Sequence, residues 1–145
     1  MISNEALYKK TSQEITALLY EALINNLEEG KGNIECADYL KANLHLQKSV
    51  DILQRLGAGL NYEAGIVADQ LESLYQYIST LVLEANLKKD TVKIDHALSI
   101  IEAVTDAWSQ AIENNKDTRS ATMKKQSLAY EQSINFREKI KYENQ

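Results

Sequence analysis

The sequence predicts an all-α fold, an antiparallel up-down four-helix bundle, and two observations support this prediction. The 145 residues include no proline and only five glycines, so the residues that usually interrupt helices are scarce. Apolar residues recur at spacings of three and four along four long segments. The connections between these segments are short, which favours antiparallel neighbours. A chain of this length suits one domain with its own core.

The first helix is expected to begin near Thr11. This residue and Glu14 have the spacing of a capping box, and Ser12 is a rival cap. The helix should run to about Glu29 and stop at Gly30, because glycine tolerates the left-handed geometry of a helix end. The polar residues before it, 1–12, are expected to form an N-terminal arm.

Three further helices are expected at about residues 35–56, 62–88 and 91–114, the last capped by Asp90. Together the four helices make a bundle at residues 13–115. The predicted core positions of the second, third and fourth helices are Tyr39, Ala42, Leu46, Val50 and Leu53; Val67, Leu71, Leu74, Ile78, Leu81 and Ala85; and Ile94, Leu98, Ile101, Thr105, Trp108 and Ile112. The extension at residues 116–145 is polar with isolated apolar residues, and an extra C-terminal helix is expected there.

Several classes of function lack the residues they need. The two histidines, His45 and His96, have no metal-ligand spacing around them and are expected at the surface, and no phosphate-binding glycine loop or nucleophile motif is present. We therefore expect no enzyme activity, metal or cofactor. A formal net charge of −5 without a basic patch argues against nucleic acid as a partner. No apolar run approaches the ~20 residues of a membrane span, and the single cysteine, Cys36, fits a cytoplasmic protein.

The helices carry more apolar residues than one buried stripe needs. Leu40 and Leu44 lie away from the stripe of the second helix, and Leu83 faces away from the stripe of the third. Such a surplus is covered either by the chain itself, through its C-terminal extension, by a second copy in a homodimer, or by a partner peptide in a groove.

Five segments in order along the chain resemble the FliS family of flagellin export chaperones. The segment TALLYEAL at residues 16–23 resembles the first-helix run of that family, and LESLYQYI at 71–78 resembles its LYDYI-like segment. LVLEANLKKD at 81–90 is similar to the stretch that closes its third helix. The resemblance is completed by LQRL at 53–56 with Leu60-Asn61 and by AWSQAI at 107–112.

The resemblance implies a cytoplasmic chaperone that binds the disordered C-terminal segment of flagellin, prevents its premature polymerisation and helps deliver it to the flagellar export apparatus. It also implies that an N-terminal arm can cover the empty groove, with Leu7 and Tyr8 as the plug. The residues expected to line the groove are Leu40, Leu44, Leu74, Tyr77 and Leu83. Asn86 is expected either to contact the partner's backbone or to cap the third helix. The alternative function is a helical homodimerisation or adaptor module without a flagellin role.

Overall fold

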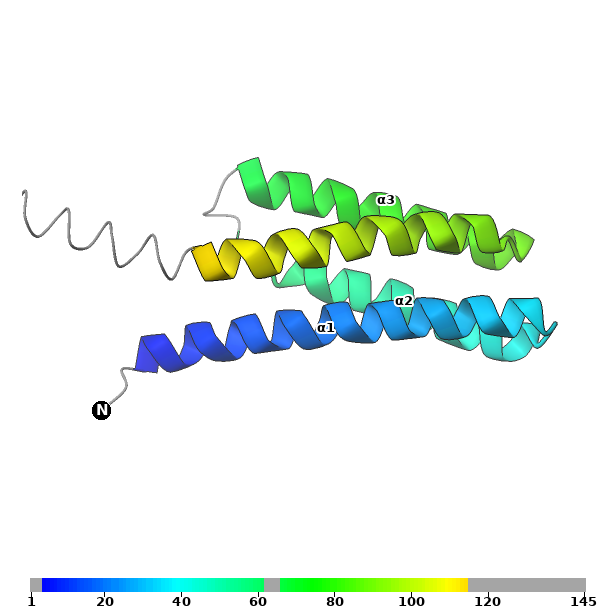
Figure 1. Cartoon of the computed structure of the whole chain (residues 1–145), viewed down its shortest axis with the longest axis horizontal. Coiled ribbons are helices and arrows are strands. Elements are labelled where there is room, and N and C mark those ends of the chain that lie inside the picture. Colours follow the sequence, from blue (N-terminus) through cyan, green and yellow to red (C-terminus); the bar gives the residue numbers. More distant parts are fainter. Residues whose placement is uncertain (1–3, 62–65, 115–145) are drawn as a thin grey trace, which may run out of the picture. The chain divides into compact units, whose positions relative to one another are not determined.

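The computed structural model describes residues 4–61 and 66–114, with side chains at 12–61 and 67–114. These residues form α1 (Asn4–Glu35), α2 (Tyr39–Ala58), α3 (Ile66–Lys88) and a fourth helix at residues 91–114, which bears no label in Figure 1. Within these ranges every regular element is a helix, so the predicted all-α class is confirmed. The extra helix predicted at 116–145 lies outside the described residues.

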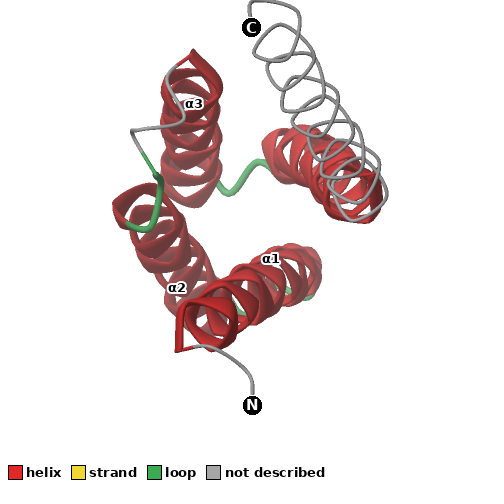
Figure 2. Ribbon diagram, turned by 90° about the vertical axis from the view of Figure 1, so that its left-hand side faces the viewer, coloured by secondary structure: helices red, strands yellow, loops and turns green. Residues whose placement is uncertain are grey.

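Residues 1–105 form one compact unit that holds α1, α2, α3 and the first part of the fourth helix. Successive helices in this unit run in opposite directions, as Figure 1 shows, and Figure 2 shows them from one end. α1 packs on α2, and α2 packs on α3. Residues 106–145 form a second unit, of which 106–114 are described and helical. The predicted antiparallel four-helix bundle is therefore confirmed.

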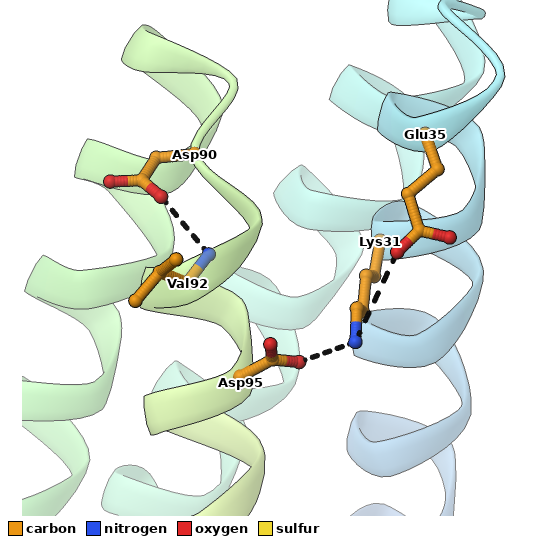
Figure 3. A network of polar contacts seen from close by, with 5 residues as sticks. All are labelled: Lys31, Glu35, Asp90, Val92 and Asp95. Atoms are coloured by element: carbon orange, nitrogen blue, oxygen red, sulfur yellow. Dashed lines mark hydrogen bonds and ion pairs between the residues drawn. The ribbon is translucent and has the colours of Figure 1, made fainter.

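Two ion pairs attach the start of the fourth helix to its neighbours. Lys31 Nζ on α1 lies 2.7 Å from Asp95 Oδ1, and it also approaches Glu35 of its own helix at 4.0 Å (Figure 3). Lys93 donates a hydrogen bond to Glu84 of α3. Lys93 lowers the pKa of the Glu84 carboxyl. The fourth helix is thus held to α1 and to α3 by partly exposed charge pairs.

α1 is longer than predicted at both ends. It begins at Asn4 rather than near Thr11, so the backbone of residues 4–12 is helical. No proline or glycine occurs in that stretch, so nothing in it stops a helix from starting earlier. The expected stop at Gly30 is wrong, because the helix continues to Glu35.

Gly30 serves helix packing instead of helix termination. The residue is buried, and a Cβ atom added there would lie 2.8 Å from Leu46 Cδ2 and 3.1 Å from Leu46 Cγ. Glycine therefore lets α1 approach α2 closely at this level. A Cβ added at Gly32 would have no neighbour within 4 Å.

α1 ends where Ala37 adopts a left-handed conformation, with φ of 60°. The Asp38 N–H donates to the Asn33 carbonyl at 2.8 Å, and the Ala37 N–H donates to the Ile34 carbonyl at 3.0 Å. These two bonds are the Schellman pattern, in which the turn satisfies carbonyls that the helix leaves free. Because this turn occupies the residues after Glu35, α2 starts at Tyr39, later than predicted.

Aspartates cap the two helices that follow tight turns. Asp38 accepts from the Lys41 N–H at 3.3 Å at the start of α2. Asp90 Oδ1 accepts from the Val92 N–H at 3.0 Å, as Figure 3 shows, so the predicted cap of the fourth helix is confirmed. Before it, Lys89 is left-handed, with φ of 53°.

The core agrees in part with the predicted one on each of α2, α3 and the fourth helix, and on α3 Ile78, Leu81 and Ala85 are buried as predicted. Ala42, Leu46 and Leu53 are buried as predicted, as are Ile94 and Ile101. Tyr39 and Val67 were expected in the core and are instead 50% and 60% exposed. The buried residues of α3 are Ala68, Tyr75, Ile78, Leu81, Val82 and Ala85.

The inner face of α3 is set by a tyrosine pair. The hydroxyls of Tyr20 on α1 and Tyr75 on α3 lie 2.6 Å apart in the core, with ring centroids 6.5 Å apart. Burial raises the pKa of both hydroxyls. Tyr75 therefore points inward and belongs to the core of α3, whereas Val67, in the first turn of the helix, is exposed.

The two histidines differ in environment. His96 is exposed, as predicted. His45 is half-buried, and its Nδ1 lies 2.9 Å from Asn26 Oδ1 of α1, so the expected surface position is wrong for this residue. The imidazole contributes a polar contact between α1 and α2.

Candidate functional site

A groove of about 570 Å³ lies between α2 and α3, and we call it the α2–α3 groove. Its lining comes from Val50, Leu53, Gln54, Gly57 and Ala58 of α2 and from Glu72, Tyr75, Gln76, Ser79, Thr80 and Leu83 of α3. The small residues at Gly57, Ala58 and Ser79 leave space that larger side chains would fill. The hollow therefore follows from the choice of small side chains where the two helices face each other.

The groove combines a buried apolar floor with an exposed apolar rim. Leu53 and Tyr75 are 2% and 4% exposed, whereas Leu83 is 56% exposed. Glu72 is the charged residue among those that line the groove, and the remaining polar ones are neutral amides and hydroxyls. Such a surface can bury apolar side chains of a peptide and offer hydrogen bonds to its backbone.

A second hollow, of about 580 Å³, lies on α3 itself. It is lined by Asp69, Gln70, Ser73, Leu74 and Tyr77. The Tyr77 ring meets the ring of His96 edge-on, with centroids 5.8 Å apart. This contact places Tyr77 on the side of α3 that faces the fourth helix. We call it the α3 hollow.

The predicted groove residues are divided between these places. Leu83 lines the α2–α3 groove, whereas Leu74 and Tyr77 line the α3 hollow. At about 100° per residue, Leu74 and Leu83 lie roughly 180° apart around α3, so one continuous groove does not hold both.

The remaining predicted site residues lie elsewhere. Leu40 and Leu44 of α2 are 83% and 52% exposed and line neither hollow. Leu7 and Tyr8 lie in the helical backbone of α1, but their side chains are outside the described ones. Their role as a plug stays a prediction.

Sequence reasoning missed most of the groove lining. Gly57 directly follows the expected end of the second helix, and Ser79 and Thr80 carry no apolar signal, yet all three line the groove. A run of small residues on one helix opposite small hydroxyl residues on the next is a signal for a gap between them. Using that signal requires knowing which faces of α2 and α3 meet. The spacing of apolar residues on α3 does not determine this.

Beyond the groove, near the end of α3, polar side chains join its two helices. Asn86 Nδ2 donates to Asn43 Oδ1 at 2.7 Å, and Lys89 Nζ donates to Asn86 Oδ1 at 2.6 Å. The same ammonium lies 5.8 Å from the ring centroid of Tyr39. Asn86 thus links α3 to α2, which fixes the spacing of the two helices rather than capping one of them.

The described residues hold no group of three or more His, Cys, Asp or Glu side chains placed to bind a metal ion. In the same part of the chain, none of the helices combines the length and the apolar character that crossing a bilayer requires.

Comparison with known proteins identifies the family. The model of the family "Flagellar protein FliS" matches residues 3–115. The flagellar secretion chaperone FliS of Bacillus subtilis is 28% identical over 109 residues, covering 75% of this chain and 81% of that protein. The chaperones of the same name from Salmonella typhimurium and Vibrio cholerae are 26% and 29% identical over 72% and 67% of this chain, and 79% and 72% of their own lengths. The helical bundle and the matched region coincide, and the chain belongs to the FliS family of flagellar proteins.

Proposed function

We propose that this protein is a cytoplasmic flagellar export chaperone that binds the disordered C-terminal region of flagellin in the α2–α3 groove. Binding would prevent premature polymerisation of flagellin and aid its delivery to the export apparatus. The proposal is supported by family membership, by relatives named as flagellar secretion chaperones, and above all by the groove with its exposed Leu83 above a buried floor.

The physical requirement for such a partner is apolar surface in excess. A disordered segment loses conformational entropy when it binds, and burial of its apolar side chains must offset that loss. Covering the exposed half of Leu83 contributes about 1 kcal/mol by itself. A single groove of this kind is therefore insufficient, and several contacts along the bundle are needed.

The α3 hollow supplies a second contact on the opposite side of α3. We expect Leu74 and Tyr77 to receive apolar side chains of the same segment, which would then pass around α3. Leu40 and Leu44 on the outer side of α2 are a third contact in this proposal. The side chains of Leu7 and Tyr8 would shield the groove when flagellin is absent and leave it on binding.

Substitution of Leu83 tests the groove, with Leu87 as its matched control. Both are exposed leucines of α3, but Leu87, which is 84% exposed, does not line the groove. A labelled peptide from the flagellin C-terminus is titrated with each full-length variant, and binding is followed by fluorescence anisotropy. We expect Leu83→Glu to weaken binding at least ~10-fold, because a carboxylate must then be desolvated on an apolar floor, and Leu87→Glu to change it less than ~3-fold. Equal effects of the two substitutions would remove the groove from the proposal.

A homodimerisation or adaptor role is the second candidate, and the exposure of Leu40 and Leu44 favours it. A symmetric dimer would bury this outer face of α2 against its own copy. Sedimentation velocity over a range of concentrations, with and without the flagellin peptide, distinguishes the two functions. The chaperone should sediment as a complex with peptide, whereas a dimer indifferent to the peptide would support the adaptor.

A further inference from the structure

Glu72 is the charged side chain among the residues that line the α2–α3 groove, and it is half-buried there. None of the ion pairs or hydrogen bonds among the described residues includes its carboxylate. Arg55 of α2 lies between two lining residues in the sequence, but it pairs with Asp51 of its own helix at 3.2 Å. The groove therefore holds a carboxylate that the described part of the chain leaves without a cation.

The hydrogen bond between Asn43 and Asn86 fixes how the residues of α2 and α3 stand opposite one another. The two helices run in opposite directions (Figure 1), so fourteen residues from that bond lead to Gly57 on α2 and to Glu72 on α3, each ~21 Å away. Gly57 is thus level with Glu72, and a Cβ added at Gly57 would have no neighbour within 4 Å. The α2 side of the groove is therefore open at the level of the carboxylate.

Leu83 lies on the same line along α3 as Glu72. The two residues are eleven positions apart, about three helical turns, so they lie ~20° apart around the helix and ~16 Å apart along it. Gln76 and Ser79 lie between them and also line the groove. This line thus begins with a carboxylate, continues with neutral polar groups and ends with a leucine that is 56% exposed.

A segment that fills the groove removes water from both ends of this line. Covering the leucine is favourable, but a carboxylate that loses its water without gaining a counter-charge destabilises the complex. A lysine or arginine of the segment removes that penalty by pairing with the carboxylate, whereas an acidic residue at the same place is repelled. Charge complementarity therefore selects which segment the groove accepts and in which register.

We propose that Glu72 is a specificity-determining residue of the α2–α3 groove: it pairs with one lysine or arginine of the bound flagellin segment, while Leu83 receives an apolar side chain of that segment. The ~16 Å between the two positions on α3 corresponds to about 5 residues of an extended segment or about 11 residues of a helical one. This inference deepens the proposed function and rests on it, because it names the chemistry that the groove requires of its occupant.

Substitution of Glu72 tests the pairing, with Glu21 as the matched control. Glu21, on α1, is exposed and lines neither hollow. A labelled peptide from the flagellin C-terminus is titrated with each full-length variant, and binding is followed by fluorescence anisotropy. We expect Glu72→Gln, which keeps the size of the side chain, to weaken binding ~5-fold and Glu72→Lys at least ~10-fold. Glu21→Gln and Glu21→Lys should change binding less than ~2-fold. Equal effects at the two positions would overturn the proposal.

Charge reversal in the peptide identifies the partner of Glu72. Each lysine and arginine of the peptide is replaced by glutamate, one at a time. One of these peptides should bind the Glu72→Lys variant at least ~5-fold more tightly than it binds the wild-type chain, and none should show that preference for Glu21→Lys. If no peptide recovers binding to Glu72→Lys, the pairing is refuted.

The spacing of the two anchors gives a second readout. Each apolar residue of the peptide is replaced by alanine and titrated with the wild-type chain and with Leu83→Ala. The residue whose loss is not additive with Leu83→Ala should lie about 5 or about 11 positions from the basic partner of Glu72. A separation below about 4 or above about 12 positions would contradict a segment that follows this line of α3.

The outcomes separate this inference from the proposed function. If Leu83→Glu weakens peptide binding while substitutions of Glu72 behave like those of Glu21, the groove keeps its function and this inference fails alone. If the wild-type chain binds no flagellin peptide at micromolar concentrations, the proposed function fails and this inference fails with it. Recovery of binding by a charge-reversed pair supports both.

Discussion

Substituting alanine for Gly30 tests whether α1 and α2 pack as closely as the structure shows. The new Cβ would lie 2.8 Å from Leu46 Cδ2 and 3.1 Å from Leu46 Cγ, and Leu46 is 1% exposed, so it has little room to move. Overpacking of this kind destabilises a fold by about 1–3 kcal/mol, whereas replacing glycine by alanine within a helix stabilises it by about 1 kcal/mol. We expect Gly30→Ala to lower the free energy of unfolding by about 0–2 kcal/mol.

Gly32→Ala is the matched control, because it lies on the same helix and its Cβ would meet nothing within 4 Å. This variant should gain up to about 1 kcal/mol from helix propensity alone. Urea denaturation of the full chain, followed by circular dichroism at 222 nm, measures both variants. The two free energies should differ by about 1–3 kcal/mol. If Gly30→Ala is as stable as Gly32→Ala, the close approach of α1 and α2 at this glycine is wrong.

Four further predictions concern stability. Tyr20→Phe and Tyr75→Phe should each lower the free energy of unfolding by about 1 kcal/mol. A double-mutant cycle measured by urea denaturation should give a coupling energy of about 0.5–1 kcal/mol between the two hydroxyls. Additive losses would show that the hydroxyls do not interact. Because burial raises the folded-state pKa of both tyrosines above 10.0, their contribution is present below pH 10 and is lost as the pH rises through the folded pKa. Thermal melting temperature should therefore fall above pH 10, and less steeply in the double Phe variant; equal slopes would contradict the pairing. Ala37→Gly should raise the free energy of unfolding by about 1 kcal/mol by relieving a left-handed alanine, and an unchanged urea midpoint would argue against that conformation. Asp90→Ala should cost about 1 kcal/mol through loss of the cap, whereas Asp90→Asn, which keeps the acceptor, should cost less.

The fold could be predicted from the sequence because its signals are local. Asp90 is followed by an apolar repeat, and capping depends only on residues two positions apart, so the start of the fourth helix was placed correctly. The absence of proline and the helical spacing of apolar residues were enough for four antiparallel helices.

The errors come from contacts between helices, which spacing does not encode. Gly30 carries the usual signal of a helix end, but its small size is used against Leu46 on another helix. On α3, the predicted stripe omits Tyr75, which is buried where its hydroxyl meets that of Tyr20 on α1. Neither contact can be predicted from the sequence of one helix alone.

The same reason limits prediction of the site. Excess apolar surface at Leu83 could be recognised from the sequence, and Tyr77 was expected in the groove from the family resemblance; both side chains are about half exposed. Their assignment to one groove could not be tested without knowing the neighbours, and the structure places Leu83 against α2 and Tyr77 against the fourth helix. The small residues that make the α2–α3 groove carry no apolar signal of their own.

Isothermal titration calorimetry of the full chain with the last ~40 residues of flagellin tests the central claim most directly, since a segment of that length can run the length of several helices. Repeating the titration at several temperatures gives the heat-capacity change of binding. The account predicts saturable one-to-one binding with a negative heat-capacity change, reduced in magnitude by Leu83→Glu but not by Leu87→Glu. Absence of binding at micromolar concentrations, or binding that is indifferent to Leu83, would contradict it.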